Sequence, residues 1–238
     1  LFVSHDLSAI STLAKKTIVL SNGEIIAIEE TNKAISIYSA LESTETIFVK
    51  DGLFPSINLS IDTFRSNIAK ECINTGAAII NDISGGKLDE KMLETVGKLG
   101  VPYVMMHMKG TPQTMQQYTD YNDLIKDIIY YFSERVAEAR SYKIKDIIID
   151  PGFGFSKTLE QNYSLLNHLE LLNMLEQPML VGVSRKSMIY KLLDTNPNEA
   201  LNGTTSLNTI ALLKGAKILR VHDVKEAMEC IKLTNQLN

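Results

Sequence analysis

Two acidic side chains stand at the ends of short apolar runs, where a buried carboxylate could bind a ligand. Asp150 ends IIID and is followed by Pro151 and a glycine-rich turn, and Asp62 ends LSID. A carboxylate in a dry pocket is costly unless it accepts charge-assisted hydrogen bonds or meets a cation. Each would suit a ligand edge that offers two neighbouring N–H donors. The alternative for both is a helix N-cap, which Pro151 makes weaker for Asp150.

A second group of residues could hold an anion. Arg220 and His222 lie two apart in ILRVHD, so on a strand both point to the same side. This pair suits phosphate or pyrophosphate, and the alternative is an internal salt bridge from Arg220 to a carboxylate. VGVSRKS places Ser184, Arg185 and Lys186 before an expected helix, where an anion or a carbonyl oxygen could bind. We expect Lys186 to reach inward and Arg185 to lie on the solvated surface.

Other motifs give weaker indications. His107 in VMMHMKGTP suits a core position and a site wall equally. The methionines beside it are expected to pack in the core rather than to bind a ligand. His168 is expected on the surface of a helix. No set of His, Cys and carboxylate residues has metal-ligand spacing, so no metal site built by the protein is expected. SGGK and GFGFSK lack the glycines of a phosphate-binding loop.

The polar candidates share one setting, because each ends an apolar run that a helical pattern follows. The strand-like runs are 58–63, 77–84, 103–108, 146–150, 178–184 and 218–222. Repeated βα units predict a parallel sheet, either open or closed into a barrel. Polar residues at the end of every run favour the barrel, because barrel enzymes build their sites from many strand ends. We predict an α/β fold, an incomplete TIM-type barrel of about six βα units.

The segment before residue 58 has a different pattern. TIVL and EIIAIEE flank SNGE (21–24), whose Asn-Gly pair predicts a hairpin, and 32–43 predicts a short amphipathic helix. The stretch 45–57, with its Gly and Pro, predicts a junction. We therefore divide the chain into an unrelated α+β segment at 1–44, a junction at 45–56 and the βα part at 57–238.

The composition is that of a globular domain and argues against several functions. Hydrophobic residues make up 45% and charged residues 22% of the 238 residues. The net charge of -4 argues against a nucleic-acid partner, and no apolar run is long enough to cross a membrane. Cys72 and Cys230 form no CxxC pair and are expected to be buried thiols of a cytoplasmic protein.

The motifs after residue 57 resemble, in order, those of the dihydropteroate synthase family: SIDTF, INDISGG, MHMKGTPQTMQ, DPGFGFSKT, VGVSRKS, NGTT and ILRVHDV. The resemblance implies a TIM barrel and a transferase of folate biosynthesis. Such an enzyme condenses p-aminobenzoate with 6-hydroxymethyl-7,8-dihydropterin pyrophosphate, releasing pyrophosphate with Mg2+ present, and many members are homodimers. Two alternatives stay open: a pterin-binding barrel fragment without turnover, and a corrinoid-linked methyltransferase barrel.

The resemblance also assigns roles to individual strand-end residues. The residues expected to bind the pterin are Asp62, Asn81, Asp150, Gly182 and Lys186. Those expected to bind p-aminobenzoate are Phe155 and Ser184, and those expected to bind pyrophosphate are Arg220 and His222. The expected catalytic residues are Lys186, Arg220 and His222.

Two family motifs, of NxTPDSF and ESTRPG type, do not occur in the sequence. We therefore expect the first two βα units to be lacking, and with them the family's metal-associated Asn. Residues 1–40 resemble the C-terminal end of an ABC transporter ATP-binding subunit of the polysaccharide-export type, with His5 as its switch histidine. Because the chain has no phosphate-binding loop, we expect no ATPase activity. The first residue is Leu, so we expect the sequence to begin partway through a reading frame.

Overall fold

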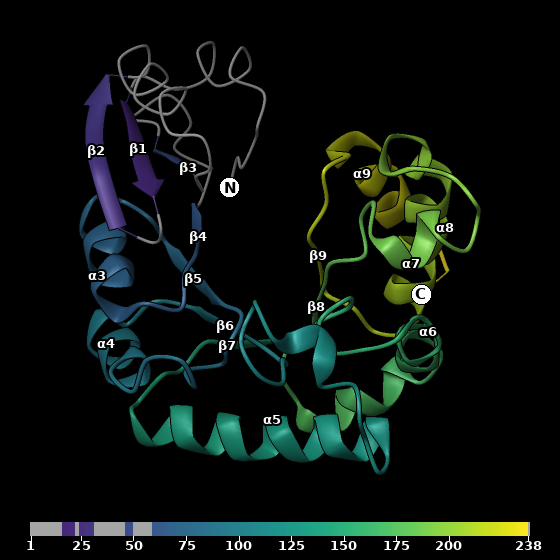
Figure 1. Cartoon of the computed structure of the whole chain (residues 1–238), viewed down its shortest axis with the longest axis horizontal. Coiled ribbons are helices and arrows are strands. Elements are labelled where there is room, and N and C mark those ends of the chain that lie inside the picture. Colours follow the sequence, from purple (N-terminus) through teal and green to yellow (C-terminus); the bar gives the residue numbers. More distant parts are fainter. Residues whose placement is uncertain (1–15, 22–23, 31–45, 50–58, 238) are drawn as a thin grey trace. The chain divides into compact units, whose positions relative to one another are not determined.

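The computed structural model describes residues 16–21, 24–30, 46–49 and 59–237, with side chains from residue 59 onward (Figure 1). The chain divides into two compact units. The first unit comprises Leu1–Asp82, Gly86–Tyr103 and Tyr142–Lys145, and the second comprises Ile83–Gly85, Val104–Ser141 and Asp146–Asn238. No helix among the described residues is long and apolar enough to span a membrane.

The described strands before residue 58 form a three-stranded antiparallel sheet. β1 (Lys16–Ser21) and β2 (Glu24–Glu30) make the hairpin that SNGE predicts, with Lys16 opposite Glu30. β3 (Thr46–Val49) pairs with the other side of β1, so the strand order is β2-β1-β3. β3 lies within the expected junction at 45–56. His5 and the predicted helix at 32–43 lie outside the described residues.

The first unit continues with two βα units. They consist of β4 (Ser60–Asp62), α3 (Ser66–Asn74), β5 (Ile79–Asp82) and α4 (Met92–Leu99). β4 and β5 pair in parallel with Asp62 opposite Asn81, so these two predicted site residues stand at the same edge of the sheet. Both helices are followed by a glycine of positive φ, since Gly76 and Gly100 have φ angles of 110° and 65°.

The second unit carries the remaining elements, apart from Tyr103, which begins β6. They are β6 (Tyr103–Met106), the 3-10 helix η1 (Met115–Gln117), α5 (Leu124–Ser141), β7 (Ile147–Asp150), α6 (Leu159–Asn167), η2 (Leu169–Leu175), β8 (Leu180–Val181), α7 (Ser187–Tyr190), η3 (Pro197–Glu199), α8 (Leu201–Leu213), β9 (Ile218–Leu219) and α9 (Val224–Thr234). α8 and α9 pack side by side (Figure 1). Every strand-like run predicted after residue 57 therefore contains a strand.

The strands after residue 58 pair in parallel and follow one another in chain order. The order in the larger sheet is β4-β5-β6-β7, and β8 pairs in parallel with β9. A parallel bridge joins Ile149 of β7 to Met179, next to β8. All four residues of β6 are buried, as expected for a strand covered on both faces. Because parallel strands share their direction, their carboxyl ends and the polar residues there stand along one edge of each sheet.

Candidate active site

In the first unit, Asp62 and Asn81 form a hydrogen-bonded pair at the ends of β4 and β5. The Nδ2 atom of Asn81 donates to Oδ1 of Asp62 over 2.5 Å, and Asn81 is buried. The N-cap alternative for Asp62 is wrong, because α3 begins at Ser66 with Arg65 as its N-cap. Among the described residues, Oδ1 of Asn81 is buried and accepts no hydrogen bond. A ligand N–H group could satisfy this acceptor, whose burial without a partner is otherwise costly.

Asp82, the next residue along β5, has a structural role. Its Oδ2 atom accepts hydrogen bonds from the Tyr103 hydroxyl at 2.6 Å and from the Gly86 N–H at 2.8 Å. The Asp82 side chain is completely buried. Its carboxylate therefore ties the turn after β5 to the start of β6.

In the second unit, Asp150 is buried at the tip of β7, as predicted. Its Oδ1 atom accepts a hydrogen bond from the Gly152 N–H at 2.8 Å. The helix N-cap alternative is wrong here too, because α6 begins at Leu159 and Thr158 caps it. Burial raises the pKa of Asp150, while Lys186, the Gly152 N–H group, Arg220 and Lys157 act to lower it.

Lys186, the N-cap of α7, reaches inward from the segment between β8 and α7, as predicted. Its ammonium donates a hydrogen bond to the Phe153 carbonyl and lies 5.0 Å from the centre of the Phe155 ring. The side chain is half-buried by surface area, but its ammonium is surrounded by protein atoms, and this burial lowers the pKa of Lys186 to about 8. Asp150 raises this pKa and Arg220 lowers it further. The structure therefore brings Lys186, Phe155 and Asp150 together around the 150–157 loop.

Ser184 and His222 join the ends of β8 and β9. The Ser184 Oγ atom lies 2.9 Å from Nδ1 of His222 and accepts a hydrogen bond from the His222 backbone N–H at 3.2 Å. Arg220 and His222 are exposed, as an anion site open to solvent requires. Gly182 stands beside Arg220, and a Cβ atom on it would lie 3.6 Å from the Arg220 Cβ atom, an ordinary contact.

The prediction that Arg185 lies on the solvated surface is only partly right, because the side chain is half-buried and paired. Its guanidinium forms a bidentate ion pair with Asp223, with distances of 2.9 and 2.7 Å, and its side chain is 23% exposed. Nη1 of Arg185 also donates to the carbonyls of Pro197 and Asn198. This ion pair holds the turn after β8 against the turn after β9. Because Ser184 precedes Arg185 and His222 precedes Asp223, the pair also keeps Ser184 and His222 close together.

The structure also places the histidines that the sequence left open. His107 is buried, and its ring meets that of Tyr131 edge to face at 4.8 Å, while His168 is exposed as expected.

Lys157, which the sequence did not single out, lies close to His107, with 3.1 Å between its Nζ atom and Nδ1 of His107. Its place at the end of the DPGFGFSK turn was the one available signal. Met105, Met106 and Met108 are buried, as predicted.

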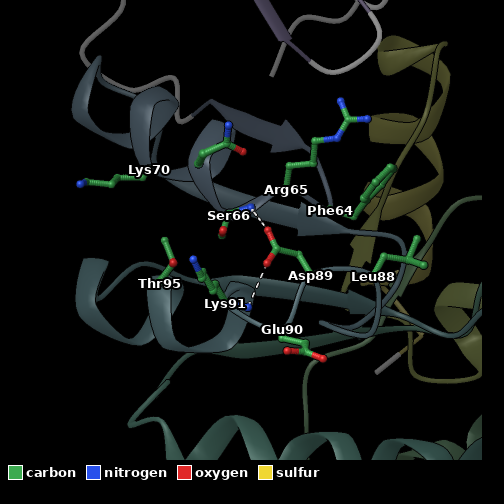
Figure 2. A pocket seen from close by; sticks show the side chains of 10 residues that line it. Phe64, Arg65, Ser66, Lys70, Leu88, Asp89, Glu90, Lys91 and Thr95 are labelled. Carbon is green, nitrogen blue, oxygen red and sulfur yellow. Dashed lines mark hydrogen bonds between the residues drawn. The ribbon is translucent and has the colours of Figure 1, made fainter.

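A pocket of about 770 Å³ lies in the first unit and is lined by residues of the segments 64–70 and 88–95 (Figure 2). Asp89 stands in its wall and accepts hydrogen bonds from the Ser66 N–H at 2.7 Å and the Lys91 N–H at 2.9 Å. These bonds tie the start of α3 to the segment before α4. None of the predicted site residues lines this pocket.

The described side chains contain no group of three or more His, Cys, Asp or Glu residues that could hold a metal ion. Mg2+ prefers carboxylate, water and substrate phosphate oxygens.

Comparison with known proteins identifies the family. The family model described as "Pterin binding enzyme" matches residues 30–222, so the match begins 27 residues before position 57. The dihydropteroate synthase of Synechocystis sp. is 41% identical over 208 residues, covering 86% of this chain and 72% of that protein.

Solved structures agree. Yersinia pestis dihydropteroate synthase, in a sulfonamide drug complex, matches with a TM-score of 0.74 and 39% identity over 76% of this chain and 66% of that one. The Thermus thermophilus enzyme in complex with 4-aminobenzoate matches with a TM-score of 0.74, 34% identity and coverage of 76% and 71%. The predicted fold of TIM-barrel type is confirmed. The chain belongs to the dihydropteroate synthase family of pterin-binding enzymes.

Proposed function

We propose that this chain acts as a dihydropteroate synthase, condensing p-aminobenzoate with 6-hydroxymethyl-7,8-dihydropterin pyrophosphate to give 7,8-dihydropteroate and pyrophosphate. The observation that carries this proposal is the buried Asp150 carboxylate at a strand tip, with the Lys186 ammonium among the charges that lower its pKa. This arrangement offers a charged acceptor for N–H donors and a cation for a carbonyl oxygen in one water-poor place.

The pterin is the ligand proposed for Asp150 and Lys186. The aminopyrimidine edge of a pterin carries neighbouring N–H donors, which an ionised Asp150 can accept, and Lys186 can donate to the pterin carbonyl. The resemblance assigns Asp62, Asn81 and Gly182 to the same ligand. The buried acceptor atom of Asn81 supports its assignment, because a pterin N–H would supply the partner that the described residues do not.

For p-aminobenzoate we propose Phe155 and Ser184. The Phe155 ring lies within 5.0 Å of the Lys186 ammonium, so an aromatic substrate packed on the ring would place its polar end beside a cation. Ser184 offers a hydroxyl beside His222. The Thermus relative solved in complex with 4-aminobenzoate supports this class of substrate.

Arg220 and His222 are proposed to hold the leaving pyrophosphate. The amine nitrogen of p-aminobenzoate forms a bond to the pterin methylene carbon, the carbon–oxygen bond breaks, and pyrophosphate departs with the electron pair. The amine then loses a proton. Because negative charge grows on the departing oxygen, fixed cations there stabilise the transition state more than the ground state.

Several finer assignments belong to the same proposal. Mg2+ accompanying the pyrophosphate and a homodimer rest on the resemblance, and a cytoplasmic location rests on the use of the two cysteines. The division of the chain at 44 and 57, with an ABC-type segment at the start, is proposed from the sequence patterns alone. No step of the reaction described above is routed through the metal.

The test is product formation from the two substrates with Mg2+, using protein that unfolds cooperatively. We expect product, and we expect Arg220→Ala to lower the rate at least about a hundredfold. Arg140→Ala is the matched control, because Arg140 is an exposed arginine at the end of α5, and its loss should leave the rate unchanged. Folded wild-type protein that binds the pterin but forms no product at high concentration would overturn the proposal and leave a pterin-binding barrel without turnover.

A further inference from the structure

Lys157 is a buried cation to which the reaction above assigns no role. Its side chain is 4% exposed, and its Nζ atom donates hydrogen bonds to the carbonyls of Gly152 and Phe155, both at 3.0 Å. The third neighbour of Nζ is Nδ1 of His107, at 3.1 Å. A lysine is almost never buried to this extent unless its charge is matched by such partners.

The hydrogen bonds of Lys157 bear directly on the loop that presents Asp150. Gly152 donates its N–H to Oδ1 of Asp150 and accepts from Lys157 with its carbonyl, so both ends of this residue are held. Gly152 has a φ angle of 71°, and a Cβ atom on it would lie 2.2 Å from the His107 carbonyl oxygen. Phe155, whose ring is proposed to pack on p-aminobenzoate, is held through its own carbonyl.

The same geometry determines where the His107 ring carries its proton. An ammonium has three hydrogens and no acceptor. With two of them on the carbonyls of Gly152 and Phe155, the third points to Nδ1 of His107, which must then be an acceptor. The ring is therefore neutral, with its hydrogen on Nε2. If Lys157 is a neutral amine, its two hydrogens stay on the carbonyls of Gly152 and Phe155 and its lone pair accepts a hydrogen bond from Nδ1–H of His107. The His107 ring then carries its hydrogen on Nδ1 instead of Nε2.

Several charged and titratable groups surround this pair. Burial lowers the pKa of Lys157 to about 7, while Asp150 raises it and Lys186 and Lys109 lower it. The rings of Tyr121 and Tyr131 face His107. With this pKa we expect Lys157 to lose its proton as the pH rises through about 7, and the tautomer of His107 to change with it.

We propose that Lys157 is a positioning residue: its buried ammonium fixes the loop 150–157, and with it Asp150 and Phe155, and sets the tautomer of His107. The consequence for substrates rests on the proposed function. The consequence for His107 does not, since it concerns the ligand-free protein.

The first measurement is the nitrogen NMR spectrum of ¹⁵N-histidine-labelled protein without ligand. The chain has four histidines, and His107→Gln identifies the signals of position 107. In wild-type protein at about pH 6 we expect the hydrogen on Nε2, and its replacement by the Nδ1–H form as the pH rises through about 7. A hydrogen on Nδ1 or on both nitrogens at pH 6 would overturn the proposal. This titration needs no variant, so it decides even if substitutions at 157 prevent folding.

The second measurement uses Lys157→Met, with Lys109→Met as the matched control. Lys109 lies on the neighbouring loop, where its ammonium stacks 3.7 Å from the Tyr121 ring centre and donates to the Asp120 carbonyl. Lys157→Met should change the His107 nitrogen shifts. It should also weaken pterin binding about tenfold, a change equal in size to the loss of one charge-assisted hydrogen bond, because the loop that presents Asp150 is no longer held. At pH 6 Lys109→Met should do neither, and at higher pH it should only move the His107 titration upward, because Lys109 is one of the charges that lower the pKa of Lys157.

Substrate kinetics separate a positioning role from a general loss of stability. We expect Lys157→Met to raise KM for both substrates more than it lowers kcat, and Lys157→Arg to restore part of the affinity. Unchanged His107 shifts and unchanged pterin binding in Lys157→Met would overturn the proposal. Absence of product from wild-type protein, with the His107 titration as expected, would instead overturn the proposed function alone.

Discussion

Replacing Arg185 by Met should destabilise the second unit markedly, although the sequence alone would place this side chain in solvent. Arg185 forms a bidentate ion pair with Asp223 and donates to two backbone carbonyls, those of Pro197 and Asn198. Met keeps a side chain of similar length, and Arg185 has a φ angle of 53° that any non-glycine residue there must share. The substitution therefore removes the charge and the hydrogen bonds with little change in backbone strain.

The expected loss follows from the exposure of the pair. The side chains of Arg185 and Asp223 are 23% and 17% exposed, so the pair is intermediate between a surface pair and a buried pair. Breaking a surface pair costs under about 1 kcal/mol, and breaking a buried pair costs about 3–5 kcal/mol. We take about 2 kcal/mol for the broken pair and about 1 kcal/mol for the carbonyls left without a donor, or about 3 kcal/mol in all. For a chain of this size each kcal/mol shifts Tm by about 2–4 °C, so Tm should fall by about 6–12 °C.

The assay is thermal unfolding followed by circular dichroism, with Glu170→Gln as the matched control. Glu170 pairs with Lys214 at 2.8 Å, but its side chain is 47% exposed, so the loss should stay below about 1 kcal/mol. Because Ser184 and Lys186 flank Arg185, KM for p-aminobenzoate should also rise in Arg185→Met. A fall in Tm no larger than that of the control would refute the reasoning and return Arg185 to the solvated surface.

Two further predictions concern the same unit and its substrate groups. Gly152→Ala should lower the free energy of unfolding by several kcal/mol, because the new Cβ atom would lie 2.2 Å from the His107 carbonyl oxygen. Gly100 has a similar φ angle and no atom within 4 Å of the position that an added Cβ would take, so Gly100→Ala should cost only about 1 kcal/mol. Equal losses of Tm in the two variants would contradict the steric argument. Burial lowers the pKa of Lys186 to about 8, so its ammonium is present below that pH and product formation should decline as the pH rises through 8. Lys186→Arg should remove the decline near pH 8, whereas any decline near pH 7 that follows Lys157 should persist; a limb near pH 8 that remains in the variant would assign it to another group.

Much of the fold could be predicted because it depends on local patterns. Apolar runs, glycine stops such as Gly100 and the Asn-Gly turn each report the conformation of a few neighbouring residues, and each corresponds to an element of the structure. The sequence placed Asp62 and Asn81 at the ends of neighbouring strand-like runs, and the structure shows that they stand opposite each other in the parallel pair.

The motifs also indicated the family, since an ordered series of short segments can be recognised in the sequence without any structure. What only the tertiary structure decided is which distant side chains meet. Arg185 and Asp223 are 38 residues apart and Lys157 and His107 are 50 apart, so no local pattern links them. Their partners follow from how parallel strands bring successive turns to one edge, and burial there turns an ordinary surface arginine and lysine into parts of the candidate site.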